Sequence, residues 1–192
     1  MSLGMCYNKG MNYDFQDNKG PVPAHQHQNP DGSLGGWVAN TAKVESTAYI
    51  GPEARVFGNA LVSGNAKVSE NARVYGNAEV FGYAKVYGDA RVFENATVSE
   101  NARVYEDAWV SGDASVYGNA KVSENARVYE GAWVSENAKV FGNALVFGHA
   151  EVYGYATVFG NAKVYGNARV FGTAEVYGTA EVHEHAEVFK SE

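Results

Sequence analysis

Residues 74–85 read VYGNAE-VFGYAK, two successive copies of the six-residue phrase that decides the fold. Across residues 38–188 every sixth residue is Val, except Ile50, which makes twenty-six equivalent positions. Across residues 42–186 every sixth residue is Ala, which makes twenty-five more. Because no residue is inserted or lost between these positions, the phrase defines one uninterrupted array of hexads.

The order of residues within a hexad predicts short β-strands. Ala and Val stand two residues apart, so on an extended chain they point to one side, while the residues between and after them point to the other. A helix is excluded, because the apolar period is two within a hexad and six between hexads, not the roughly 3.6 of a helix. Stacked hexads bury Ala and Val in a continuous column, and each buried Val contributes on the order of 1.5–3 kcal/mol. The sequence therefore predicts an all-β solenoid.

A two-residue corner separates successive strands. Its first residue, at the twenty-two positions from 58 to 184, is Gly fourteen times and Glu eight times. Each of these Glu residues is followed by Asn, Asp, Gly or His, the residue types that best tolerate positive φ. We therefore predict positive φ at the second corner residue of most hexads. Four examples are Asn71, Asn77, Asn101 and Asn125.

Size, charge and composition narrow the class of protein. The chain of 192 residues has the length of one domain, and its net charge of −7 argues against a general binder of nucleic acid or membrane surfaces. No apolar run is long enough for a membrane-spanning helix, and residues 1–20 lack the hydrophobic segment of a secretory signal. The single cysteine, Cys6, permits no disulfide within the chain. We expect a soluble, cytoplasmic protein, with a phage-associated or otherwise exported protein as the open alternative.

The first 34 residues lie outside the array. They contain three of the four prolines and an Asp31-Gly32 turn signal. The first coil of a solenoid exposes unpaired backbone that something must cover. We therefore expect residues 1–34 to form an irregular N-terminal cap and residues 35–192 to form the solenoid. The alternative is a small head that binds a partner or a metal, since His25 and His27 have the spacing of a ligand pair on an extended chain.

The order aliphatic-x-Gly-Asn-small-x, sustained from residue 38 to residue 188, resembles the hexapeptide-repeat superfamily. That superfamily includes acyltransferases, γ-class carbonic anhydrases, and bacterial and phage proteins built from Gly-Asn-Ala repeats. The resemblance implies a left-handed parallel β-helix with three hexads per coil, and assembly as a trimer. Twenty-six hexads then make between eight and nine coils, a rod roughly 40 Å long. Neither the number three nor the hand follows from the periodicity itself.

With three hexads per coil, residues eighteen apart stack in columns on one face. The residue after each Val is mostly Phe, Tyr or Ser, which predicts ladders of aromatic rings on the outside. Such pairs strengthen strand pairing by roughly 0.2–1 kcal/mol each, and we favour this stabilising role. Burial against other subunits and a sugar-stacking surface are the alternatives. The interface candidates are Phe57, Tyr75, Phe93, Tyr129, Phe147, Tyr165, Tyr87, Tyr105, Phe141 and Phe159.

The residue before each Val forms three further columns, and one of these is basic. It contains Lys67, Lys85, Arg103, Lys121 and Lys139. Because stacked like charges repel, we expect the corner residues Glu70, Glu106 and Glu124 to neutralise them in a solvated ion-pair ladder. A binding strip for an anionic polymer is the alternative, which the net charge disfavours.

Histidine is the residue type to consider for catalysis. By resemblance, acyltransferases of the family use a His as general base and bind acyl-CoA between subunits, and γ-class carbonic anhydrases hold a metal with three His from two subunits. The catalytic candidates are His149, His183 and His185, and the metal candidates are His25, His27, His149 and His185. The corner positions of His149 and His185 should lie two coils apart, ~10 Å, too far to share a metal without a partner chain. We expect no cofactor.

These observations favour a structural or interaction role over an enzymatic one. The preferred function is a rigid, self-associating scaffold without an evident catalytic centre, a homotrimer by family resemblance, that binds neither nucleic acid nor membrane. One alternative is an acyltransferase-like enzyme with its site between subunits, and another is a metal site like that of γ-class carbonic anhydrases. The sequence names no substrate and no partner protein.

Overall fold

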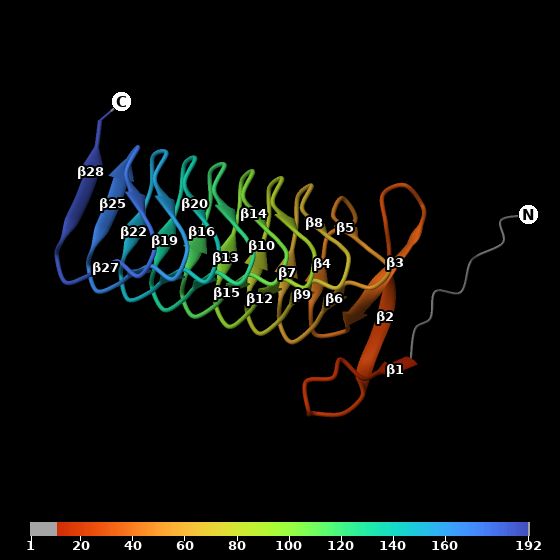
Figure 1. Ribbon diagram of the computed structural model, residues 1–192. Coiled ribbons are helices and arrows are strands. Elements are labelled where there is room, and N and C mark those ends of the chain that lie inside the picture. Colours follow the sequence, from red (N-terminus) through yellow and green to blue (C-terminus); the bar gives the residue numbers. More distant parts are fainter. Residues whose placement is uncertain (1–10, 192) are drawn as a thin grey trace, which may run out of the picture.

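Each hexad forms one short strand, made of the residue before Val and Val itself, followed by a turn over the two corner residues. The computed structural model describes residues 11–191, so Cys6 lies outside it. Every solenoid strand before the last coil pairs in parallel with the strand eighteen residues on, as Arg73 does with Arg91. Three hexads therefore make one coil, and the coils stack into a rod (Figure 1). The predicted parallel β-helix and its eighteen-residue step are confirmed.

The three strands of each coil belong to three sheets, which we call walls A, B and C. The solenoid strands of wall A are β3 (Leu34–Ala39), β6 (Arg55–Val56), β9 (Arg73–Val74), β12 (Arg91–Val92), β15 (Trp109–Val110), β18 (Arg127–Val128), β21 (Leu145–Val146), β24 (Lys163–Val164) and β27 (Glu181–Val182). The strands of wall B are β4 (Lys43–Val44), β7 (Leu61–Val62), β10 (Glu79–Val80), β13 (Thr97–Val98), β16 (Ser115–Val116), β19 (Trp133–Val134), β22 (Glu151–Val152), β25 (Arg169–Gly172) and β28 (Glu187–Lys190). The strands of wall C are β5 (Tyr49–Ile50), β8 (Lys67–Val68), β11 (Lys85–Val86), β14 (Arg103–Val104), β17 (Lys121–Val122), β20 (Lys139–Val140), β23 (Thr157–Val158) and β26 (Glu175–Val176).

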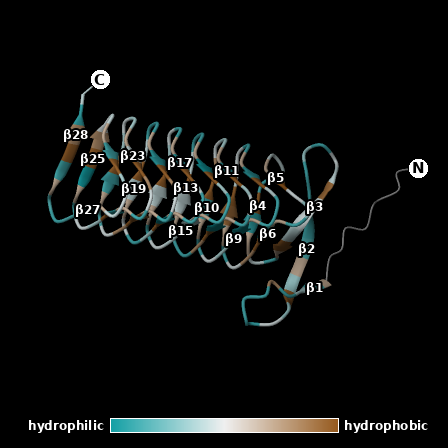
Figure 2. Ribbon diagram, in the orientation of Figure 1, coloured by the Kyte–Doolittle hydropathy of each residue, from teal (hydrophilic) through white to brown (hydrophobic). Residues whose placement is uncertain are grey.

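The interior of the rod is a column of Val and Ala. Val104 and Val128, for example, have no exposed surface, and almost all their equivalents are the same. Val points inward and its neighbours point outward, so hydrophobic and hydrophilic residues alternate along the coils (Figure 2). Outside, the rings of Phe57 and Tyr75 stack 4.8 Å apart, which is the rise expected for one coil.

The prediction of positive φ at the second corner residue is wrong. The left-handed conformation lies at the first corner residue instead: φ is 59° at Glu100, and every Gly at the equivalent corner position also has positive φ. The turn closes with a hydrogen bond from the N–H of Ala102 to the carbonyl of Ser99, at 3.2 Å. The four Asn residues named in the prediction do not adopt positive φ. They are Asn71, Asn77, Asn101 and Asn125.

Glu is an unusual residue for this conformation, which costs a side chain roughly 1–2 kcal/mol. At four corners its carboxylate offsets this by accepting a hydrogen bond from the backbone N–H eighteen residues on, at the same corner of the next coil. These bonds, 2.7–2.9 Å long, join Glu70 to Gly88, Glu94 to Gly112, Glu106 to Glu124 and Glu130 to Gly148. At these corners Glu is therefore stabilised in the left-handed conformation by a contact between coils, which residue preferences for positive φ do not reveal.

Wall A is extended at the N-terminal end of the rod by two antiparallel pairings (Figure 1). Strand β1 (Met11–Tyr13) pairs with β2 (Val22–Gln28), and β2 pairs with β3. The register of the second pairing shifts between Gln26 and Gln28. Phe15, which is 1% exposed, stacks on Phe57 of the solenoid. The region predicted as an irregular cap thus contains two strands of its own. Among residues 11–191, no helix is long and apolar enough to cross a membrane.

Side chains of this cap cover the first edge of wall C. The side chain of Asn29 donates to the carbonyl of Ile50 at 3.1 Å and accepts from its N–H at 2.8 Å, as a neighbouring strand would. Nε2 of His27 lies 3.1 Å from the carbonyl oxygen of Ala48. These contacts satisfy backbone groups that the first coil would otherwise leave unpaired.

The corner geometry predicts that replacing Glu100 with Gly stabilises the rod. Within residues 11–191 the Glu100 carboxylate accepts no hydrogen bond, and Gly adopts positive φ without penalty, so Glu100→Gly should raise the free energy of unfolding by about 1 kcal/mol. Glu94→Gly is the matched control and should gain less, because it loses the bond to Gly112. Urea unfolding followed by circular dichroism measures both variants. A loss of stability in Glu100→Gly would refute the argument.

Candidate functional site

Wall A carries a column of arginines that was not predicted. In successive coils the residue before Val is Arg55, Arg73, Arg91, Trp109 and Arg127, each paired with the next in the parallel ladder. The corner residues two positions earlier form a second row, which contains Glu53, Asn71, Asp89, Asp107 and Asn125. These ten residues line a groove of about 540 Å³, which we call the arginine groove.

Trp109 helps to hold two of these arginines in place. The guanidinium carbons of Arg91 and Arg127 lie 5.0 and 4.5 Å from the centre of its ring. A cation–π contact of this kind uses the plane of the guanidinium and leaves its N–H donors available. At the cap end, Arg55 donates to Oε1 of Gln16 at 2.9 Å. The groove is therefore lined by cations whose positions are restrained.

The arginine groove contains charges of both signs, but among the described residues its arginines are not held in ion pairs. Burial lowers the pKa of the Arg73 guanidinium, and the charges of Arg55 and Arg91 on either side lower this pKa further. In the part of the chain that the structure describes, Arg73, Arg91 and Arg127 form no ion pair with a carboxylate. Within residues 11–191 the four arginines of the groove therefore have no ion-pair partner, although the carboxylates of Glu53, Asp89 and Asp107 line the groove as well.

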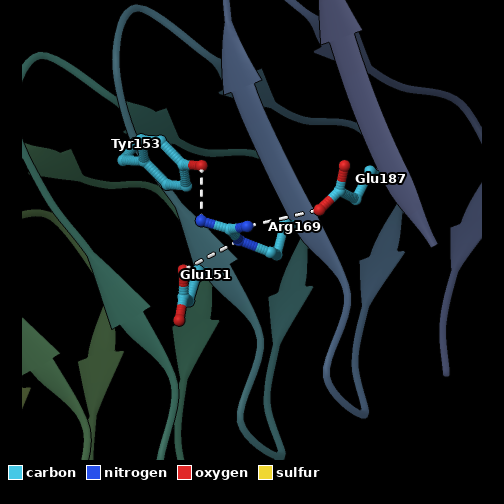
Figure 3. Close-up of polar contacts among 4 residues, drawn as sticks. All are labelled: Glu151, Tyr153, Arg169 and Glu187. Carbon is cyan, nitrogen blue, oxygen red and sulfur yellow. Dashed lines mark hydrogen bonds and ion pairs between the residues drawn. The ribbon is translucent and has the colours of Figure 1, made fainter. Parts of the chain in front are cut away.

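Wall B shows how the same fold neutralises an arginine. Arg169 lies between Glu151 and Glu187, one coil to either side, and its guanidinium nitrogens are 3.2 Å from a carboxylate oxygen of each (Figure 3). It also donates to the hydroxyl of Tyr153 at 2.9 Å. Glu in the neighbouring coil is therefore sufficient to pair an arginine in a column, and the arginines of the groove have no such neighbour.

The ion-pair ladder predicted on wall C is wrong. Within residues 11–191 no Lys or Arg of that basic column forms an ion pair. Two of the carboxylates expected to neutralise it, those of Glu70 and Glu106, accept backbone hydrogen bonds from the next coil. Lys67 lies over the ring of Tyr49 at 4.6 Å. The corner carboxylates reach along the rod axis and not across the wall, which is why the prediction failed.

The aromatic residues after Val stack in ladders, and all ten interface candidates lie in them. Ring centres in these ladders are separated by 4.8–5.1 Å in pairs such as Phe57–Tyr75, Tyr87–Tyr105 and Phe141–Phe159. Phe57 is only 6% exposed, because Phe15 of the cap covers it. The other nine are half-buried along the walls. Their role in assembly stays a prediction.

The structure separates His149 from the other two catalytic candidates, His183 and His185, which lie near each other at the C-terminal end of the rod. His149 lies at a corner, next to Gly131 of the preceding coil. The two are so close that a Cβ added to Gly131 would lie 2.7 Å from Nδ1 of His149. His183 stacks on Tyr165 at 5.2 Å, and His185 is exposed in the last coil. Among the described residues, no three His, Cys, Asp or Glu side chains are grouped to hold a metal. A role for these histidines in catalysis stays a prediction that requires a neighbouring subunit.

His25 and His27 lie on β2 in the cap and have different partners. Nδ1 of His25 is 2.9 Å from Oδ1 of Asn40, whereas His27 is buried and bonded to the Ala48 carbonyl. Since a carbonyl only accepts, Nε2 of His27 carries the proton. Burial lowers the pKa of His27, the bond to Ala48 opposes this, and the nearby His25 lowers the pKa further. Both rings are thus occupied in holding the cap, and metal binding by the pair stays a prediction.

Comparison with known proteins gives one family match over two short stretches and one structural likeness. Residues 54–70 and 84–100 match the family model described as the YdcK β-solenoid repeat. No curated protein matches the chain. Among solved structures, the chain is similar to the UDP-N-acetylglucosamine acyltransferase of Francisella novicida, with 16% identity and a TM-score of 0.42. The match covers 72% of this chain and 60% of that enzyme, which is less than two thirds of the enzyme's length.

The repeat and the coil geometry together define the class. A hexad with Ala and Val at fixed positions, Val being replaced only by Ile50, and strands that pair at a step of eighteen residues make this chain a parallel β-helix built from hexapeptide repeats.

The buried position of His27 predicts that the cap is sensitive to acid. Below the ordinary His pKa of about 6.5, the unfolded chain binds a proton that the folded chain does not. The free energy of unfolding should therefore fall as the pH drops through this value towards the lower folded-state pKa. His27→Gln keeps a donor for Ala48 and should remove this part of the pH dependence, whereas His25→Gln should remove little. Urea unfolding at about pH 7.5 and about pH 5.5, followed by tryptophan fluorescence, measures the effect. An unaltered pH dependence in His27→Gln would show that another group is responsible.

Proposed function

We propose that this protein is a scaffold, a stiff rod that self-associates and presents fixed columns of side chains to its partners. The observation that carries this proposal is the unbroken parallel ladder, in which each strand from β3 to β25 pairs with the strand one coil further on. Each coil holds the side chains of the next at one strand spacing, about 4.8 Å. Solenoids of this kind provide extended binding surfaces whose geometry varies little along their length.

The aromatic ladder of wall C is the surface on which we place the contact between copies. Phe141, Phe159 and Tyr177 stack there at 5.1 and 5.4 Å. Tyr177 is 58% exposed, and Tyr155, at the corner that leads into the same wall, is 59% exposed. Contiguous exposed apolar surface often marks an interface. The family resemblance favours three copies of the chain with their rods side by side.

Substituting one ring of this ladder tests the proposal. Ser already stands in the same column at Ser69 and Ser123, so Phe159→Ser introduces a residue that this column accommodates. If wall C joins the subunits, this change should raise the dissociation constant about tenfold or more, as expected for a central aromatic contact. Light scattering over a range of protein concentrations measures the assembly.

The matched control is Phe93→Ser on wall A, whose column already contains Ser111. It should leave the assembly unchanged. A strictly monomeric wild-type protein at high concentration would rule out self-association. Dissociation caused by Phe93→Ser alone would show that the subunits meet at wall A and not at wall C.

A further inference from the structure

The arginine groove contains a repulsion that the fold does not need. Arg55, Arg73 and Arg91 are direct neighbours in a parallel ladder, where like charges destabilise the sheet. Arg169 on wall B shows that Glu in the adjacent coils would remove the repulsion. The basic column of wall C carries the same repulsion, so repulsion alone does not mark a site. The arginines of wall A differ because they line one groove together with carboxylate and amide side chains. A groove that holds unpaired guanidinium groups beside carboxylates and amides suits a ligand that carries both carboxylates and hydroxyl groups.

The side of the groove opposite the arginines offers hydrogen-bond acceptors. Four exposed corner side chains stand there, those of Asn71, Asp89, Asp107 and Asn125. Across the described residues, none of the four hydrogen-bonds to another side chain. Elsewhere, corner side chains do bond from coil to coil, as Asn77 does to Asn95 at 3.0 Å. In the groove's own corner row such bonding resumes just beyond it, from Asn143 to Asn161 at 3.1 Å. Unpaired acceptors thus face unpaired donors along the same length of the rod.

The groove is linear and has a defined length. From Arg55 to Arg127 it spans four coil steps, about 19 Å at the ordinary strand spacing. The contact of Arg55 with Gln16 of the cap lies at one end, and Leu145 follows Arg127 at the other. A ligand along the groove meets a guanidinium at nearly every step. One pyranose sugar in a linear chain is about as long as the spacing between two coils. Carboxylates on successive sugars would therefore have nearly the same spacing as the arginines.

We propose that the arginine groove binds an acidic oligosaccharide, a linear chain of uronic acids that lies along the rod axis. Arg73, Arg91 and Arg127 bind the carboxylates, for which the guanidinium fork is well suited. Asp89 and Asp107 accept hydrogen bonds from the sugar hydroxyls. The same two aspartates, with the net charge of −7, repel the denser charge of a nucleic-acid backbone.

Isothermal titration calorimetry of the full chain with tetragalacturonic acid tests the proposal. The double variant Arg73→Gln/Arg91→Gln should weaken binding at least tenfold, because it removes two charge-assisted contacts. Arg103→Gln/Lys121→Gln, which removes the same charge from adjacent coils of wall C, should bind as the wild type does. A neutral maltotetraose should give no heat. Arg73→Lys keeps the charge but not the fork, and should weaken binding several-fold in a protein that folds normally.

Removing the acceptors distinguishes a sugar from other anions. Asp89→Ala/Asp107→Ala relieves repulsion for both anionic ligands, but only tetragalacturonic acid loses acceptors for a full set of sugar hydroxyls. The double variant should therefore weaken the binding of tetragalacturonic acid relative to that of a short oligodeoxythymidylate. Three results would overturn the proposal: no heat from the wild-type protein at millimolar tetragalacturonic acid, equal affinity in Arg73→Gln/Arg91→Gln, or tighter binding of the oligodeoxythymidylate by the wild type. Thermal unfolding of Arg73→Gln should show no loss of stability, since the change relieves repulsion.

Discussion

The structure depends on Val packing against Val at every eighteenth residue. Each buried Val contributes on the order of 1.5–3 kcal/mol, and the same packing sets the register, because a slip of one residue would turn every Val outward. Val and Ala together fill the interior so completely that sequence variation is confined to the outward columns and the corners. Whatever this protein binds, it binds through those columns.

The corners show how a backbone conformation selects residue types through contacts between coils. The first corner residue must adopt positive φ, and only Gly and Glu occupy it between residues 58 and 184. Gly meets this requirement through its lack of a side chain. Glu meets it where its carboxylate bonds to the next coil, as Glu106 does with the N–H of Glu124. A local strain is thereby offset by a contact that exists only in the stacked solenoid.

The fold and the columns were accessible from the sequence because the invariant Val and Ala repeat without interruption. Three hexads per coil came from family resemblance, and the pairing of Arg73 with Arg91 confirms it. The site of positive φ was not accessible, since residue preferences favour Asn over Glu and the bond from Gly88 to Glu70 appears only between coils. The arginine groove was overlooked because Trp109 interrupts its column, while the basic column of wall C is unbroken. The sequence did contain a signal for the groove: no residue eighteen positions before or after these arginines is Glu.

The coil step also limits how such a chain can change length during evolution. Gain or loss of a complete coil leaves each later residue on its own wall. Gain or loss of a single hexad keeps every Val inside, but it rotates everything that follows onto the neighbouring wall, so that Arg127 would no longer continue the line of Arg91. The core would tolerate such a change and the surface would not. That hexads are gained or lost in multiples of three is therefore a constraint imposed by binding and not by folding.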